Sequence, residues 1–113
     1  MPPPDPDLDA LDPDRLREAL AAAGYTVDGV EDLLGPRAFL ALARGQVVPA
    51  LRVARGGSPL ETLVRLFLLR TAEPAAAVER ALAPHGLGPA LQAGLVERDG
   101  DLVRAALDVR PYG

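Results

Sequence analysis

Prolines and glycines divide this chain into short segments, and their placement constrains the fold more than any other feature of the sequence. The 113 residues include 12 prolines and 11 glycines. Proline fits the first turn of a helix, where its missing N–H costs nothing, and glycine is favoured just past the last turn. Segments that begin near a proline and end at a glycine therefore predict a series of short helices.

Apolar residues recur at helical spacing inside most of these segments. Asp12 can cap a first helix that begins at Pro13 and ends at Gly24. Leu11 and Leu16 stand at the two positions of a hydrophobic staple at the start of this helix. The apolar stripe that begins at position 60 is nearly continuous, which places its helix at the centre of the fold. We expect helices over 13–23, 29–34 (capped by Asp28), 36–44, 49–55, 59–69, 74–83 and 89–93.

The pattern changes from helical to alternating after Gly94. Asp99-Gly100 is a hairpin turn signal, so strands are expected over 95–98 and 101–109. Every second residue from Val103 to Val109, Leu107 included, is expected to face inward. The fold class is therefore mainly α with a small C-terminal β-hairpin. The order is a helical extension followed by helix, helix, short helix and hairpin, as in a winged helix.

The only serine, Ser58, directly follows Gly56-Gly57, which invites comparison with catalytic and phosphate-binding turns. A P-loop needs a Lys after its glycines, and the chain has no Lys. A nucleophile elbow needs Gly-x-Ser-x-Gly, and Leu60 occupies the last place. The spacing from Ser58 to Glu61 is that of a capping box, so Ser58 is expected to cap a helix to which Gly56-Gly57 is the hinge. An anion at this helix N-terminus is the less favoured alternative.

No other segment carries the residues of an active site. His85 is expected to be a surface loop residue, because one His in a chain without Cys cannot build a zinc site. Gly86-Leu87-Gly88 begins like a dinucleotide fingerprint, but Leu91 occupies the place of the third glycine and no strand precedes it. The alternating acids Asp5, Asp7 and Asp9 lack the glycine of a calcium loop. We expect no catalytic, cofactor-binding or metal-ligating residue.

Charge is unevenly distributed. Residues 1–35 carry nine acids and two arginines, a net charge of −7, and residues 36–113 carry +3, which gives −4 for the chain. Residues 1–10 have the composition of a disordered, acidic, Pro-rich leader and lack the basic start and apolar middle of a signal peptide. No apolar run approaches the ~20 residues of a membrane span. A single cytoplasmic domain over residues 11–113, without membrane or metal, is expected.

Three arginines are the candidate docking residues. Arg44, Arg52 and Arg55 lie close in sequence around the short helix expected from Pro49. A small cationic cluster can attract an anionic partner without specifying its identity. Surface arginines also commonly do no more than solvate a face, and the sequence leaves both interpretations open.

The winged-helix order raises DNA binding as a hypothesis, and the residues argue against it. Segment 89–93, in the place of a recognition helix, has no charge and only one polar side chain, Gln92. The expected hairpin tip, residues 97–101, is net negative. Binding that neutralises several phosphates needs several well-placed cations. Sequence-specific DNA binding is therefore the less favoured hypothesis.

Three segments carry a resemblance to a known family: "AAAGYTVDGVEDLLG", "PALRVARGGSPLETLVRLFLL" and "LDVRPYG". Together they resemble the N-terminal domain of actinobacterial class I S-adenosylmethionine-dependent methyltransferases, related to the release-factor glutamine and nucleic-acid amino-group methyltransferases. The resemblance spans about residues 13 to 113, and the block from Arg55 to Leu60 is its most specific part. It implies a Rossmann-like catalytic domain after residue 113, with a Gly-rich loop for S-adenosylmethionine and an Asn-Pro-Pro motif.

Neither of those two motifs occurs in this chain, which contains no Asn. The resemblance therefore carries no catalytic or cofactor residue onto any position here. It implies a non-catalytic accessory domain that recognises or docks a macromolecular methyl acceptor, protein or nucleic acid, for its own downstream catalytic domain. The alternatives are a winged-helix regulator that binds nucleic acid and a free-standing helical protein–protein adaptor.

Overall fold

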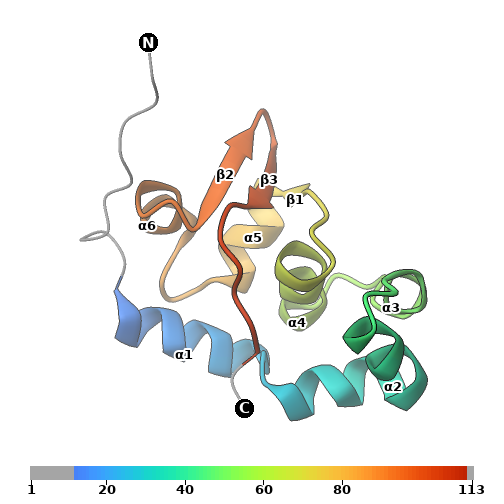
Figure 1. Ribbon diagram of the computed structural model, residues 1–113. Coiled ribbons are helices and arrows are strands. Elements are labelled where there is room, and N and C mark those ends of the chain that lie inside the picture. Colours follow the sequence, from blue (N-terminus) through green and yellow to red (C-terminus); the bar gives the residue numbers. More distant parts are fainter. Residues whose placement is uncertain (1–11, 112–113) are drawn as a thin grey trace.

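Helices form most of residues 12–111, the part of the chain that this computed structural model describes (Figure 1). A small three-stranded antiparallel sheet lies near the C-terminal end of that part. The mainly α fold with a small C-terminal β element is therefore confirmed. The expected leader over residues 1–10 and the staple residue Leu11 lie outside the described residues.

Helix α1 (Pro13–Ala23) has the boundaries that its sequence predicts. The Asp12 side chain accepts a 3.2 Å hydrogen bond from the Arg15 N–H, which satisfies one of the donors of the first turn. Gly24 ends the helix in the left-handed conformation, with a φ of 80°. Ala19 is fully buried, whereas Leu16 and Leu20 are only partly covered by the core. Helix α1 thus lies against the outside of the core.

The two helices expected on either side of Gly35 are the two helical segments of α2 (Val27–Ala43), which meet in a kink at Gly35. Gly35 has a φ of 82° and a ψ of 160°, which glycine adopts without steric cost. The cap predicted at Asp28 is wrong. The Thr26 hydroxyl instead accepts the N–H of Gly29 at 2.9 Å, because Thr26 still has the extended backbone of a capping residue while Asp28 already lies in the first turn.

The next helices supply the centre of the core. Helix α3 (Val48–Val53) packs against α2, and α4 (Pro59–Leu63) begins where expected. The single helix expected over 59–69 changes its winding after Leu63, and Val64–Leu68 form a π-helix, η2. Nothing in the apolar spacing indicates this change. Four neighbouring side chains on α4 and η2 are at most 1% exposed: Leu63, Val64, Leu66 and Phe67.

The remaining elements have the order strand, helix, helix, hairpin. They are β1 (Glu73–Pro74), α5 (Ala75–Ala81), α6 (Leu87–Gln92), β2 (Val96–Asp99) and β3 (Leu102–Ala105). Strand β3 lies in the middle of the sheet and pairs antiparallel with both others, with Glu73 opposite Val103 and Val96 opposite Ala105. Together with α4 and η2, these elements follow the order helix, helix, short helix and hairpin that the sequence predicts, with the short strand β1 in addition.

The hairpin differs from the expected one at its turn and at its end. The two-residue turn is Gly100-Asp101, because Asp99 still pairs with Leu102. The strand expected to reach residue 109 stops at Ala105. The N–H groups of residues 106 and 107 both donate to the Leu95 carbonyl, which bends the chain away from the ladder. Leu107 is consequently 50% exposed, and its expected inward position is wrong.

His85 is buried, and the expectation of a surface position is wrong. The residue is only 5% exposed. Nε2 accepts the Asp12 N–H at 3.4 Å, and Nδ1 lies 3.2 Å from the Gly86 carbonyl, so Nδ1 is the protonated nitrogen in this arrangement. His85 thereby ties the start of α1 to the loop between α5 and α6.

Residues 106–111 run from the sheet to the junction between α1 and α2 (Figure 1). The Tyr25 hydroxyl donates a 2.6 Å hydrogen bond to the Val109 carbonyl. Arg70 donates from Nη1 to the Leu107 carbonyl at 3.2 Å. These two bonds hold the C-terminal segment of the described chain across the core.

Candidate docking surface

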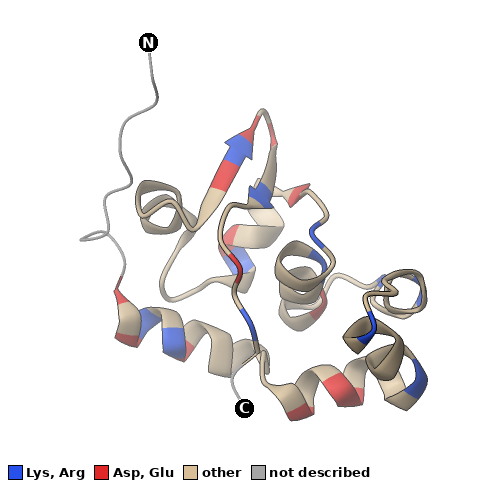
Figure 2. Ribbon diagram, viewed as in Figure 1, with Lys and Arg blue, Asp and Glu red and all other residues tan. Residues whose placement is uncertain are grey.

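The second half of α2 and helix α3 form an arm, residues 36–55, that carries only positive charge. Arg37, Arg44, Arg52 and Arg55 are all exposed, and the arm contains no acidic residue (Figure 2). Within residues 12–111, none of the four guanidinium groups lies within 4.0 Å of a carboxylate. The three arginines expected from the sequence to form a docking cluster thus share one arm. Arg37 was missed, although the absence of acids between Asp32 and Glu61 could have indicated it.

The arm also exposes apolar side chains. Leu40 is 59% exposed, Val48 53% and Val53 44%, whereas Ala50 and Ala54 are fully buried on the side that faces the core. Helix α3 therefore buries Ala50 against the core and exposes Val48, Arg52 and Val53. Such a surface can contact a partner through both charge and apolar area.

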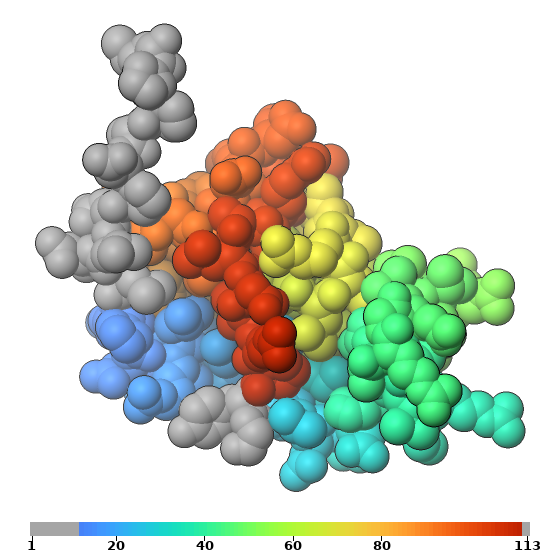
Figure 3. Space-filling view, viewed as in Figure 1, coloured from blue at the N-terminus to red at the C-terminus, as the bar shows by residue number. Residues whose placement is uncertain are grey.

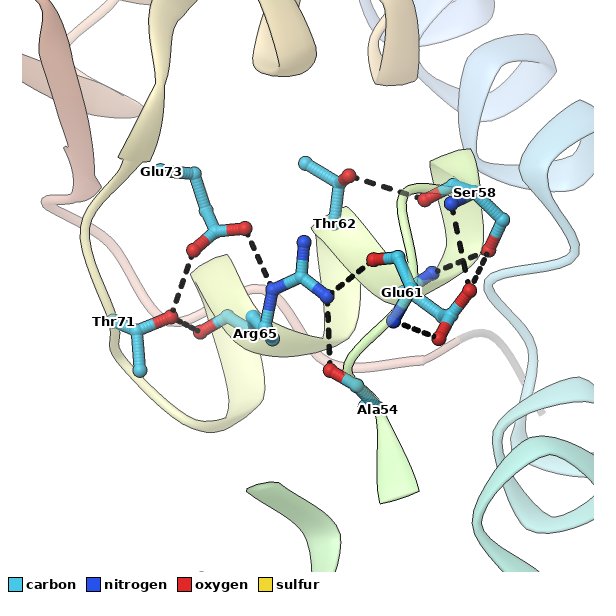
Figure 4. A network of polar contacts seen from close by, with 8 residues as sticks. Ala54, Ser58, Glu61, Thr62, Arg65, Thr71 and Glu73 are labelled. Atoms are coloured by element: carbon cyan, nitrogen blue, oxygen red, sulfur yellow. Dashed lines mark hydrogen bonds and ion pairs between the residues drawn. The ribbon is translucent and has the colours of Figure 1, made fainter. Parts of the chain in front are cut away.

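A buried ion pair fixes the arm to the rest of the fold at the α3–α4 joint, residues 54–58 (Figure 4). Arg65 of η2 donates from Nε to Glu73 Oε1 at 2.7 Å. Its Nη1 donates to the carbonyls of Ala54 at 2.8 Å and Gly56 at 2.6 Å. The Thr71 hydroxyl donates to the second Glu73 oxygen at 3.1 Å. The pair is therefore hydrogen-bonded on both sides, as a buried ion pair must be.

Glu61 closes the same joint from the other side. The capping box predicted from the sequence is confirmed: the Ser58 hydroxyl accepts the Glu61 N–H at 3.1 Å, and the Glu61 carboxylate accepts the Ser58 N–H and hydroxyl. The carboxylate also accepts the Gly56 N–H at 2.6 Å. Burial acts to raise the pKa of Glu61, but the hydrogen bonds from Gly56 and Ser58, together with the charge of Arg65, lower it overall.

Gly56-Gly57, which the sequence suggested as a hinge, is held by hydrogen bonds from both sides. We call residues 54–58 the clamped joint. Both the N–H and the carbonyl of Gly56 are bonded. A Cβ at Gly56 would collide with the Glu61 carboxylate, whereas a Cβ at Gly57 would meet nothing within 4 Å. Gly56 is needed for the close approach of Glu61, and the arm is held in a defined place.

The described residues offer no arrangement for chemistry at this surface. The Ser58 hydroxyl is occupied by Glu61, and His85 is occupied by Asp12 and Gly86. No three His, Asp or Glu side chains within residues 12–111 are grouped as metal ligands. None of the helices in this range has the length and apolar content to cross a bilayer. The arm is thus a candidate for binding.

The β2–β3 hairpin, residues 96–105, which we call the wing, is the other candidate surface, and its charges are mixed. Arg98 and Arg104 are exposed, but Arg104 lies 3.7 Å from Asp99 and Arg98 donates to the Gly100 carbonyl. Glu97 and Asp99 also face solvent there. Helix α6 exposes no charged residue. The arm, with four arginines and no acid, offers the stronger attraction to an anion.

Two hollows open on the surface of the described residues, and the larger borders the arm, because Phe39, Leu42 and Ala43 line it. The larger encloses about 760 Å³ between α2 and η2, and the smaller encloses about 460 Å³ against α1. The larger hollow escaped prediction because the segments that line it, α2, η2 and residues 108–111, are far apart in the chain. The smaller hollow is lined by residues 13–26 alone.

Comparison with known proteins identifies the family. Residues 22–106 match the family described as "Domain of unknown function (DUF7059)", and the chain belongs to this family. No curated protein and no solved structure shows significant similarity to the chain.

Proposed function

We propose that this member of the DUF7059 family is the accessory docking domain of an S-adenosylmethionine-dependent methyltransferase. In this proposal the domain is not catalytic, and it holds a macromolecular methyl acceptor for a catalytic domain that follows it in the same polypeptide. Support comes from the resemblance of residues 13–113 to the N-terminal domains of such enzymes. A cytoplasmic location is part of the same proposal.

The observation that carries the docking role is the acid-free arm. Four exposed arginines lie within 20 residues of sequence, and each lacks a carboxylate partner within residues 12–111. Exposed arginines draw an anionic macromolecule toward a surface and orient it as it approaches. The clamped α3–α4 joint keeps that surface at a fixed position on the domain. An arm of this kind suits an acceptor with an acidic or phosphate-bearing surface.

A winged-helix regulator that binds duplex DNA is the second candidate. The order of α4, β1, α5, α6 and the β2–β3 hairpin favours it. The uncharged α6 and the acids at the wing disfavour it, because duplex binding relies on cations placed along the phosphates. A free-standing adaptor remains the third candidate.

The experiment that tests the proposed function uses the full-length parent protein and a variant that lacks residues 1–113. The full-length protein is expected to transfer methyl groups to a macromolecular acceptor. The truncated variant should show at least a tenfold higher KM for that acceptor, with unchanged affinity for S-adenosylmethionine. The 113-residue chain alone should not bind S-adenosylmethionine in a calorimetric titration. Micromolar binding by the chain alone, or an unchanged KM on truncation, would contradict the proposal.

A further inference from the structure

The arm presents arginines and aliphatic side chains on the same sides of its two helices. In the second half of α2, Arg37, Leu40 and Arg44 are spaced i, i+3 and i+7, which places them on one side of the helix, and all three are exposed. In α3, Val48 and Arg52 are spaced i and i+4, and both are exposed. Each helix of the arm therefore places an aliphatic side chain beside a guanidinium group on its solvent side.

Exposed apolar side chains are concentrated in the arm. Within residues 12–111, six large apolar side chains are exposed, and three of them, Leu40, Val48 and Val53, belong to the arm. The arm accounts for only 20 of these 100 residues, so it holds more than twice the share that an even distribution would give it. Apolar side chains that are grouped among charged ones on a surface are typical of a protein–protein contact.

The cationic surface of the arm is short, and acids lie next to it. In Figure 3 the arm, coloured teal to green, forms one edge of the molecule, away from α1 in blue. Its part of α2, residues 36–43, is about 12 Å long at about 1.5 Å per residue. The first half of the same helix carries the exposed acids Asp28, Glu31 and Asp32 (Figure 2). A long phosphate backbone that follows α2 beyond the arm meets these acids, whereas a short anionic segment fits the arm alone.

The side chains of the arm favour a protein partner over a nucleic acid. Single-stranded nucleic acids stack their bases on aromatic side chains. The arm has one aromatic residue, Phe39, which is half-buried and lines the larger hollow. The exposed Leu40, Val48 and Val53 offer no aromatic face, and a sugar–phosphate backbone presents a polar and charged surface to them. Aliphatic side chains of a polypeptide can pack on these three residues, and its carboxylates can each accept two parallel hydrogen bonds from an arginine.

We infer that the arm, residues 36–55, binds an acidic protein segment in which carboxylates are interspersed with aliphatic side chains. The carboxylates face the four arginines, and the aliphatic side chains pack on Leu40, Val48 and Val53. This inference rests on the docking role of the proposed function and narrows its partner to a protein. Salt weakens the attraction between the charges and leaves the apolar contact in place, so part of the binding should persist at high salt.

Peptide selection on the 113-residue chain tests this inference. A displayed library of random peptides of about 12 residues, each long enough to span the arm when extended, is selected on the unmodified chain. The selection is carried out at a physiological ionic strength of about 0.15 M, which screens weak charge contacts. The enriched peptides are expected to combine Asp or Glu with Leu, Ile or Val. Fluorescence anisotropy then gives the Kd of the most enriched peptide for the chain.

Two variants separate the charged from the apolar contribution. Arg37→Gln with Arg44→Gln is expected to raise the Kd of this peptide about tenfold at physiological salt and less at high salt. Leu40→Ser should raise it about threefold at both salt concentrations, because it removes apolar contact area. Arg98→Gln with Arg104→Gln removes the same charge from the wing and is the matched control, which should leave the Kd unchanged. Circular dichroism shows whether each variant keeps its fold.

The other outcomes overturn the inference or separate it from the proposed function. Enriched peptides without Asp or Glu, no enrichment at all, or a Kd that the arm variants leave unchanged overturn the inference. Tighter binding of a single-stranded RNA or a DNA duplex than of the best peptide, at the same salt, overturns it in favour of nucleic acid. A parent protein that transfers no methyl group overturns the proposed chemistry, whereas an arm-dependent acidic peptide still supports the inference. A raised acceptor KM on truncation, without any acidic peptide selected, supports the proposed function and overturns the inference.

Discussion

The Tyr25 hydroxyl donates a 2.6 Å hydrogen bond to the carbonyl oxygen of Val109, a residue 84 positions further along the chain. The Tyr25 ring is fully buried and lies against Phe67, with ring centroids 6.2 Å apart. One residue thus joins the start of α2, the centre of the core and the C-terminal segment. The path of residues 106–111 depends on this contact.

Tyr25→Phe is expected to lower the free energy of unfolding by about 1 kcal/mol, because it removes the hydrogen bond and keeps the packed ring. Urea unfolding followed by circular dichroism measures the change. Tyr112→Phe provides the same chemical change elsewhere in the chain. A loss of less than a few tenths of a kcal/mol at Tyr25 would mean that water replaces the bond at no cost.

The difference in unfolding free energy between the unmodified protein and Tyr25→Phe should depend on pH. Burial, followed by the negative charge of Asp108, raises the pKa of Tyr25 well above its ordinary value. A raised pKa in the folded state contributes stability below the unfolded pKa of about 10, and that contribution is lost as pH rises further. The chain has no Lys or Cys to titrate in this range. The stability advantage over Tyr25→Phe should therefore shrink between pH 9 and 11, and a constant difference would contradict the burial argument.

Arg65→Met should destabilise the domain by about 3 kcal/mol, because it leaves the Glu73 carboxylate charged and buried without its cation. The Glu73 side chain is only 8% exposed. The double variant Arg65→Met with Glu73→Leu should recover much of the loss, since it removes both charges. Urea unfolding of the unmodified protein, the single variant and the double variant measures both changes in stability. A single variant that loses less than about 1 kcal/mol would show that the pair does not hold the joint.

Ser58→Ala should cost about 1 kcal/mol of stability through loss of the helix cap. In the full-length methyltransferase that we propose, kcat at a permissive temperature should stay within twofold of the unmodified value. Thermal unfolding and initial-rate assays on the same preparations measure the two effects. Unchanged stability with a collapse of methyl transfer would instead assign Ser58 a chemical role.

The two glycines of the joint should respond differently to alanine. Neither has a φ in the left-handed region, so alanine is compatible with the backbone at both. Gly57→Ala should be neutral or stabilise by up to about 1 kcal/mol, because it restricts the unfolded chain and meets open space. Gly56→Ala should destabilise, because its Cβ displaces the bonded Glu61 carboxylate. Equal melting temperatures for the two variants would contradict the clamped joint.

Local signals predicted those parts of the fold that depend on neighbouring residues. The cap at Asp12, the capping box from Ser58 to Glu61 and the end of α1 at Gly24 are each set by hydrogen bonds within a few positions. Three of the four arginines of the arm were predicted from the sequence in the same way, because Arg44, Arg52 and Arg55 are close in sequence. These features need no knowledge of the rest of the chain.

Features that depend on distant partners escaped prediction. Strand β1 has two residues and exists only because β3 pairs with it. His85 is buried by the start of α1, 73 positions away. The π-helix keeps the apolar spacing of an α-helix, so its sequence gives no sign of the extra residue in the turn.

The KM for the methyl acceptor in two charge-reversed variants of the full-length methyltransferase that we propose tests the proposed docking role most directly. Arg52→Glu with Arg55→Glu alters the arm, and Arg98→Glu with Arg104→Glu alters the wing by the same change in charge. We predict that the arm variant raises the acceptor KM about tenfold at low salt and less at high salt, while kcat and S-adenosylmethionine affinity stay unchanged. The wing variant should leave KM within twofold. A raised KM for the wing variant with an unchanged KM for the arm variant would contradict the account and favour a winged-helix mode of binding.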